Sequence, residues 1–166
     1  MSPKIALIAW MALGVPAKED RMDESKQVME SLQGEWQMIK ADFGALPGPP
    51  PMDKELPRFV IKGNQITIVE KNRNEDATFK VDLSKKPYAI DIQPIPPKGA
   101  KGAREELLKG IFDVTNDTLK ITIALPNFGG PPDAKGAPPA PERPADFNPR
   151  PNVPTMAIVF QRVRSK

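Results

Sequence analysis

Cysteine and histidine are both absent from the 166 residues of this chain. Their absence excludes thiol nucleophiles, serine triads that depend on histidine, zinc sites built from Cys or His ligands, and disulfide bonds. Bacterial lipid anchoring through a cysteine after the N-terminal apolar segment is excluded for the same reason. A cysteine-free protein is indifferent to the redox state of its compartment, so export is permitted but not demonstrated.

Aromatic residues and clustered charge are also scarce. The chain has one Tyr and two Trp, and its 24 basic and 21 acidic residues are scattered and give a net charge of +3. No dense run of Lys or Arg forms the stripe that follows a phosphate backbone, and several stacking aromatics are hard to assemble. We therefore expect no nucleic-acid partner.

Carboxylates are the remaining candidates for catalysis or metal binding, and none of them falls in a recognisable motif. They are Asp82, Asp91, Glu105, Glu106, Asp113, Asp117 and Asp146. Asp117 next to Asn116 is explained by a hairpin turn, and the Glu pair by a solvated loop or short helix. We predict that the chain is not an enzyme and needs no cofactor or metal.

Proline is the residue in excess, at 21 of 166, whereas the usual share is ~5%. Its density limits helix interiors and central strands. Two Pro-rich loops are expected, at residues 46–57 and 126–154. Long loops inside compact domains are usually lids, binding surfaces or disordered segments. The length of the chain fits one domain, because domains usually run to roughly 100–200 residues.

The first 17 residues have the three parts of a secretory signal peptide. Lys4 supplies the basic start, residues 5–14 form an apolar run, and small residues around Ala17 match a cleavage site. The run is shorter than the ~20 residues of a membrane-spanning helix, so we expect no membrane span. The alternative is a buried first helix. A signal peptide predicts export, to the periplasm, the envelope or the medium, of a mature chain that begins near Lys18.

The segment 18–31 is interpreted as a short helix and linker. Val28, Met29 and Leu32 recur at helical spacing, and Asp23, Glu24 or Ser25 can cap the helix that precedes Leu32. Beyond Leu32 the apolar residues change from helical to alternating spacing. The remaining residues, 32–166, are therefore expected to form the folded domain.

Alternation predicts about eight short strands, which favour an all-β antiparallel barrel of the lipocalin or calycin type. The expected strands are residues 34–41, 59–62, 65–69, 78–83, 88–92, 108–114, 118–125 and 155–163. The side chains expected to line the interior, and to contact a small apolar ligand if one binds, are Trp36, Met38, Phe59, Ile61, Ile66, Ile68, Phe79, Val81, Ile90, Ile92, Leu119, Ile121 and Ile123.

Several ordered motifs between Leu32 and Val163 resemble a lipocalin-like domain family of unknown function that is expanded in planctomycete bacteria. They are Leu32-Gln33-Gly34-Glu35-Trp36, the segment 79–91, Lys109-Gly110-Ile111-Phe112, the segment 117–121, and Glu142-Arg143-Pro144-Ala145-Asp146-Phe147. The resemblance implies a calycin-like barrel and exported members. It implies no catalytic residue, because no activity is established for the family.

Gly34 and Trp36 also resemble the first-strand motif of lipocalins, in which the Trp closes one end of the barrel beneath a basic side chain from the last strand. Arg162 and Arg164 are the candidates for that basic side chain. Strand alternation favours Arg162, because it shares a face with Ile158 and Phe160. The alternative is that Trp36 is an ordinary core residue.

The segment with Arg143, Asp146 and Phe147 has two interpretations. It is either a lid that lays Phe147 over the barrel mouth, fixed by a charge-assisted bond, or a plug that completes the core. We expect a monomer, and two functions are open to it: a module that binds a small apolar ligand in the barrel, or a structural or protein-interaction domain of the cell envelope with a filled barrel. An interior cavity of ~300 Å³ or more would favour the ligand.

Overall fold

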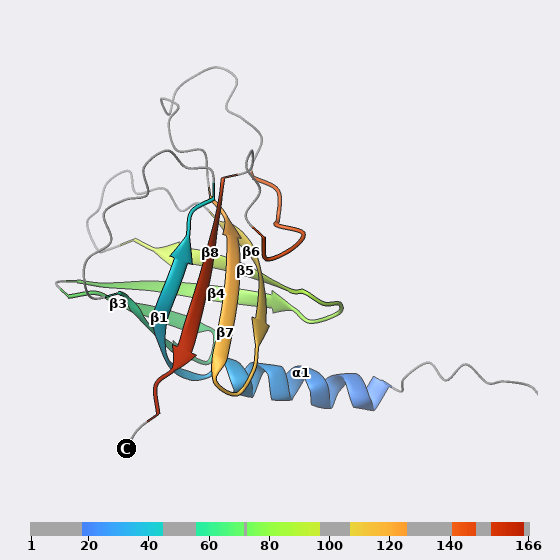
Figure 1. Ribbon diagram of the computed structural model, residues 1–166. Helices are drawn as coiled ribbons and strands as arrows, with labels where there is room; N and C mark the ends of the chain where they lie inside the picture. The colour runs from blue at the N-terminus through green and yellow to red at the C-terminus, as the bar shows by residue number, and fades with distance from the viewer. Residues whose placement is uncertain are drawn as a thin grey trace, which may run out of the picture.

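A computed structural model describes residues 18–44, 56–71, 73–96, 107–125, 141–148 and 154–164. These residues form one helix followed by eight strands (Figure 1). The elements are α1 (Lys18–Leu32), β1 (Gly34–Asp42), β2 (Arg58–Lys62), β3 (Gln65–Val69), β4 (Asn74–Asp82), β5 (Tyr88–Ile95), β6 (Leu108–Val114), β7 (Thr118–Ala124) and β8 (Thr155–Arg162).

The strands form a closed antiparallel barrel in chain order, in which β1 pairs with both β2 and β8. Closure leaves no continuous free strand edge for unwanted pairing with another chain. The fold predicted from the alternation, an antiparallel barrel of about eight strands with one short N-terminal helix, is therefore confirmed. It is consistent with a lipocalin-like barrel.

Tight turns at one end of the barrel follow from local sequence. Lys62 pairs with Gln65, so Gly63 and Asn64 alone connect β2 to β3. Gly63 has φ +60°, a left-handed conformation that glycine adopts without steric cost. The Gly-Asn pair therefore permits the two-residue hairpin that the alternation predicted.

The interior of the barrel is a continuous apolar core. Every side chain expected to line it belongs to this core or packs against it, with Ile68 and Val81 in the partly buried shell. Leu32, Tyr88, Phe112 and Phe160 belong to it as well. Alternation selected the inward faces correctly because one face of each strand is excluded from water.

A β-bulge interrupts the alternation in β1. The register with β8 shifts between Met38 and Lys40, so Lys40 as well as Ile39 lies on the outer face, where Ile39 is 51% exposed. A bulge places two residues of one strand opposite one of its partner, so the inward face resumes with Ala41, which packs against the core.

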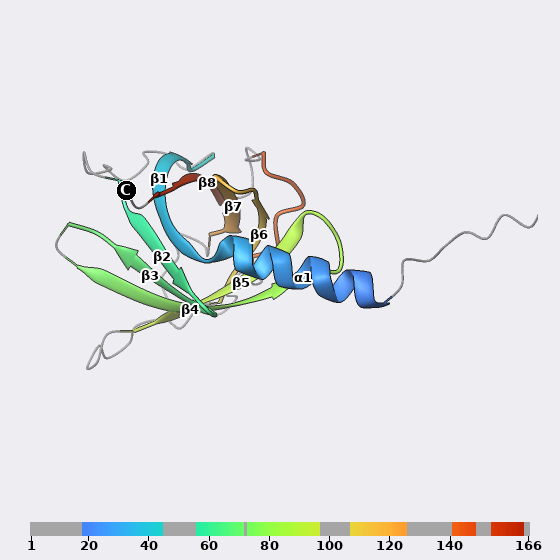
Figure 2. The ribbon, with the colours of Figure 1, turned by 90° about the horizontal axis from the view of Figure 1, so that it is seen from below.

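The helix α1 covers the end of the barrel where the short turns lie (Figures 1 and 2). Its Val28, Met29 and Leu32 pack against the core, as their helical spacing predicted. The hydroxyl of Tyr88 donates a hydrogen bond to Glu24 across 3.0 Å. The helix begins at Lys18, earlier than the apolar spacing indicated, because its first turns protrude beyond the barrel and need no apolar face.

Candidate functional site

The two ends of the barrel differ in how the strands are connected. Residues 63–64, 83–87 and 115–117 make short turns beside α1, at what we call the closed end. At the opposite end, which we call the mouth, residues 70–73 make a short turn, and the other strand pairs are joined by the longer stretches 43–57, 96–107 and 125–154. Because loops on a rigid scaffold carry most binding residues, the mouth is the first place to look for a site.

At the closed end, Arg162 lies over the indole of Trp36, with 4.1 Å between the guanidinium carbon and the ring centroid. The two residues face each other in the β1–β8 register. Arg162 also donates to the backbone carbonyl oxygens of Gln33, Ser31 and Asn116. The contact expected from strand alternation is therefore present. It explains how the last strand fixes the end of the helix to the barrel.

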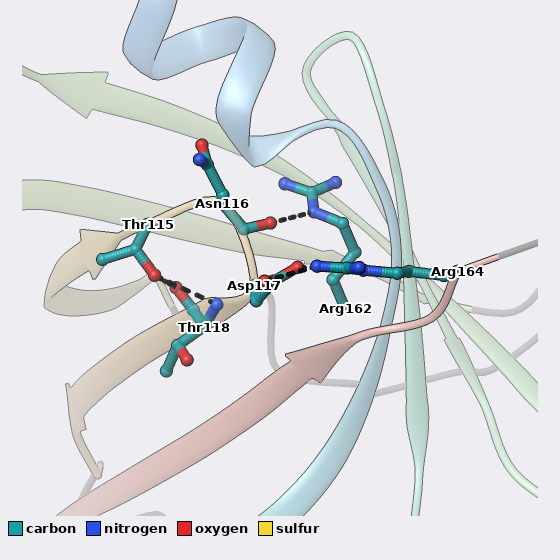
Figure 3. Close-up of polar contacts among 6 residues, drawn as sticks. All are labelled: Thr115, Asn116, Asp117, Thr118, Arg162 and Arg164. Carbon is teal, nitrogen blue, oxygen red and sulfur yellow. Dashed lines mark hydrogen bonds and ion pairs between the residues drawn. The ribbon is translucent and has the colours of Figure 1, made fainter.

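Arg164, the other candidate for the Trp36 partner, makes a surface ion pair. Its Nη2 lies 2.6 Å from Oδ2 of Asp117 in the β6–β7 turn (Figure 3). The hydrogen bond from Arg164 lowers the pKa of the Asp117 carboxyl below its ordinary value. The turn itself is closed by Thr115, whose Oγ1 accepts a hydrogen bond from the Thr118 amide, 3.1 Å away. Asp117 therefore acts in turn structure, as the sequence indicated.

Aromatic and aliphatic side chains fill the barrel next to its closed end. Phe59 packs on Phe160 with 4.4 Å between ring centroids, and Tyr88 on Phe112 with 5.5 Å. Trp36, Phe112, Leu119 and Phe160 are each 0% exposed. A side chain beside a water-sized void would retain accessible surface, so these four residues border no such void. Of the predicted lining, Trp36 and Leu119 therefore belong to the packed core next to the closed end.

A recess of about 540 Å³ lies at the mouth. It forms where β1 leaves β2: their pairing ends at Gln37 and Arg58, and the Met38 amide then donates to the carbonyl of Pro57. We call it the mouth recess. It is lined by Gln37, Met38, Leu56, Arg58, Val69, Glu70 and Lys71. Of these residues, the sequence identified only Met38, because strand periodicity does not show where two strands separate.

The lining of the mouth recess combines charged and apolar side chains. Arg58 contacts Glu35 across 3.3 Å, and Glu70 accepts a hydrogen bond from Arg73 across 3.0 Å. Within the described part of the chain, the exposed Lys71 makes no ion pair. The recess thus combines the apolar side chains of Met38, Leu56 and Val69 with the cation of Lys71.

Arg143 holds the segment 141–148 against the wall of the barrel. Its guanidinium lies 2.6 Å from Oδ1 of Asp91, and it also donates to the carbonyl oxygens of Ile90 and Gly110. Asp146 accepts a hydrogen bond from the Asn148 amide across 2.8 Å, and Phe147 is half-buried. The carboxylate that Arg143 contacts is therefore Asp91, a pairing that the sequence did not reveal.

The described carboxylates that the sequence offered as candidates for catalysis or metal binding serve local structure. Asp91 pairs with Arg143, Asp117 pairs with Arg164, and Asp113 stands opposite Lys120. A hydrogen bond from Ser84 lowers the pKa of Asp82, which accepts the Ser84 amide. Glu105 and Glu106 lie outside the described residues. In the part of the chain that the structure describes, no group of three or more acidic side chains could hold a metal ion.

The same described residues include no helix long and apolar enough to cross a bilayer. Most of the two Pro-rich loops, and the expected signal peptide at residues 1–17, lie outside the described residues. Comparison with protein-family models, with curated proteins and with solved structures finds no match for this chain. A functional proposal therefore depends on the geometry and on the sequence motifs.

Proposed function

We propose that this chain is an exported, lipocalin-like domain without enzymatic activity, which acts as a structural or protein-interaction module with a filled barrel. The observation that carries the proposal is the 0% exposure of Trp36, Phe112, Leu119 and Phe160, which pack the barrel next to its closed end. The lipocalin-like assignment is supported by the Gly34-x-Trp36 motif together with the Arg162 guanidinium over the indole.

A filled barrel binds partners on its surface, and the mouth offers the better surface. Ile95 at the end of β5 and Leu107 just before β6 are 44% and 40% exposed there. A partner that covered both side chains would remove this apolar surface from water. The closed end, in contrast, is occupied by α1 and by polar contacts that hold the fold together.

Titration of the protein with dodecanoate, followed by NMR of labelled Ile and Met methyl groups, tests the filled barrel. The interior methyls of Ile66, Ile90 and Ile121 are expected to keep their chemical shifts, because no apolar chain can enter beside them. Saturable shifts of these methyls would contradict the proposal and show that the barrel opens to a ligand.

A second candidate function is binding of a small amphipathic molecule in the mouth recess. It is favoured by the volume of about 540 Å³ and by a lining that combines Lys71 with the apolar side chains of Met38, Leu56 and Val69, a combination that suits an apolar chain with an anionic head. In the same titration the Met38 methyl would shift saturably while Ile121 would not. Lys71→Gln would weaken the binding of dodecanoate but not that of dodecanol.

Export is tested by mass spectrometry of the protein isolated from its native host. We expect the N-terminus near Lys18, because the pattern that ends in Val15-Pro16-Ala17 is typical of a cleaved signal peptide. Intact Met1 in a cytoplasmic fraction would contradict this part of the proposal and leave the binding proposal untouched.

A further inference from the structure

Four residues on the outer wall of the barrel are buried although their side chains point away from the core. Their neighbours Gly110, Phe112, Ile121 and Ile123 face inward, so alternation turns these four outward. Outward side chains of a barrel wall ordinarily contact water, yet the exposure of Ile111 is 2% and that of Ala124 is 0%. We call the four the outer strip: Ile111, Thr122, Ala124 and Thr155.

The segment 141–148 lies against this side of the barrel, beside β5 and β6 (Figures 1 and 2). It is attached there by Arg143, which bonds to Ile90 and Asp91 of β5 and to Gly110 of β6. Gly110 immediately precedes Ile111, and Ile111 stands opposite Thr122 in the register. The segment that Arg143 anchors is therefore next to Ile111, the residue of the outer strip on β6.

Covering the outer strip has opposing energetic effects. Burial of Ile111 stabilises the covered state, because apolar surface leaves water. Burial of Thr122 and Thr155 opposes it, because the Oγ1 atoms of both residues are buried without a hydrogen-bond partner. When these effects compete, an added attachment decides which state is populated.

We propose that residues 141–148 form a releasable strap, that Arg143 is its latch, and that release uncovers the outer strip. The latch is suited to reversible opening. Its ion pair with Asp91 is only partly buried, with 32% and 34% of the two side chains exposed, so water and competing anions can reach it. Three polar bonds hold the strap at Arg143, and breaking them leaves the barrel ladder intact.

Solvent paramagnetic relaxation of Ile δ1 methyl groups, with a neutral gadolinium chelate, tests this proposal. In the unmodified protein the relaxation rate of Ile111 should match that of the interior Ile121 and stay well below that of the exposed Ile39. In Arg143→Ala the rate of Ile111 should rise toward that of Ile39, while Ile121 stays unchanged. Arg143→Lys should give an intermediate rate, because lysine keeps the charge but loses the planar fork.

Arg164→Ala is the matched control, because Arg164 makes a comparable ion pair on another face. An Ile111 rate that stays at the value of Ile121 in folded Arg143→Ala would overturn the proposal. So would an equal rise in Arg164→Ala. If neither variant at Arg143 folds, the residue belongs to the global fold rather than to a local latch, and the proposal is likewise overturned.

Discussion

Arg162 covers the indole of Trp36 and also caps the C-terminal end of α1, the helix that precedes Trp36 in the chain. The helix α1 ends at Leu32, where the last backbone carbonyls of a helix lack partners within the helix. The guanidinium supplies donors to the carbonyls of Ser31 and Gln33, 2.6 and 2.7 Å away. A cation is also favourable at the negative end of the helix dipole. One side chain of the last strand thus fixes both the first strand and the helix.

The first prediction concerns this pair. Trp36→Ala should lower the free energy of unfolding by about 3–5 kcal/mol, as large-to-small core changes do. Arg162→Ala should lower it by about 1–3 kcal/mol, because it leaves helix carbonyls without donors. The double variant should lose less than the sum, by about 0.5–3 kcal/mol, because contacting residues couple. Denaturant unfolding of the three variants measures the coupling, and strict additivity would show that the contact contributes nothing.

The second prediction concerns Asp117. The hydrogen bond from Arg164 lowers its pKa, so the pair stabilises the fold above the ordinary carboxyl pKa, and this contribution is lost as the pH falls through the lowered value. Arg164→Gln should move the titration midpoint of Asp117 upward, toward about 3.9. The carboxyl ¹³C shift of Asp117, followed by NMR, reports this midpoint. A midpoint that does not move would show that the pair does not persist in solution.

The third prediction uses the single tyrosine of the chain. Burial raises the pKa of Tyr88, and its hydrogen bond to Glu24 raises it further. The folded protein therefore holds the phenol proton more tightly than the unfolded chain, so this stabilisation is present below pH ~10 and lost as the pH rises through the raised value. Absorbance of the tyrosinate should show a midpoint above that of a free tyrosine, and Glu24→Gln should lower it.

A Tyr88→Phe variant is the control for this alkaline effect. It should lose about 1 kcal/mol at neutral pH, the usual net value of one hydrogen bond, and should lack the part of the alkaline destabilisation that belongs to Tyr88. An unshifted midpoint in the unmodified protein would indicate that α1 does not stay docked on the barrel through Glu24.

The alternation of apolar and polar residues predicted the strands because one face of each strand is excluded from water. It failed where both faces of a strand are exposed. The sequence placed the start of β4 near Thr78, but the strand begins at Asn74. Asn74, Glu75 and Asp76 are all exposed, so their strand conformation comes from pairing with β3 and not from an apolar face. Propensity in strands depends on such partners, which a single sequence does not show.

Pro94 shows the same limit at the end of β5. Proline usually ends a central strand, and the expected strand stopped at Ile92. The pairing of β5 with β6 ends at Ile92 opposite Leu108, while the pairing with β4 continues to Ile95. Pro94 thus lies where β5 is locally an edge, a position that proline tolerates.

The candidate sites were less predictable than the strands. Alternation did select Arg162, because the register of the last strand follows from its apolar face. The mouth recess and the Asp91–Arg143 pair instead join segments far apart in the chain. The hydrogen bond that Gln37 donates to the carbonyl of Leu56 spans 19 residues, and the one that Arg143 donates to Asp91 spans 52. Their formation depends on how the barrel closes, which hydrophobic spacing does not encode.

The last prediction concerns Gly110, where a side chain has no room. A Cβ there would lie 2.7 Å from the carbonyl oxygen of Thr122 and 2.8 Å from Cγ2 of Ile123. Gly110→Ala should therefore destabilise the fold by about 1–3 kcal/mol, as overpacking does. Ile123→Ala should not rescue it, because the closest atom belongs to the backbone of Thr122. Gly63→Ala is the control: it meets nothing within 4 Å, so it reports only the cost of its positive φ, roughly 1–2 kcal/mol.

Gly110 also offers its carbonyl oxygen to Arg143, so a backbone shift at this position should reach the strap. Chemical denaturation gives the stability of both glycine variants, and methyl NMR reports whether Ile111 changes. We expect Ile111 to respond in Gly110→Ala and not in Gly63→Ala. If Gly110→Ala is as stable as the unmodified protein, then β6 and β7 lie further apart in solution than the contacts around Gly110 require. The conclusion that the barrel is tightly packed at the level of Gly110 would then be wrong.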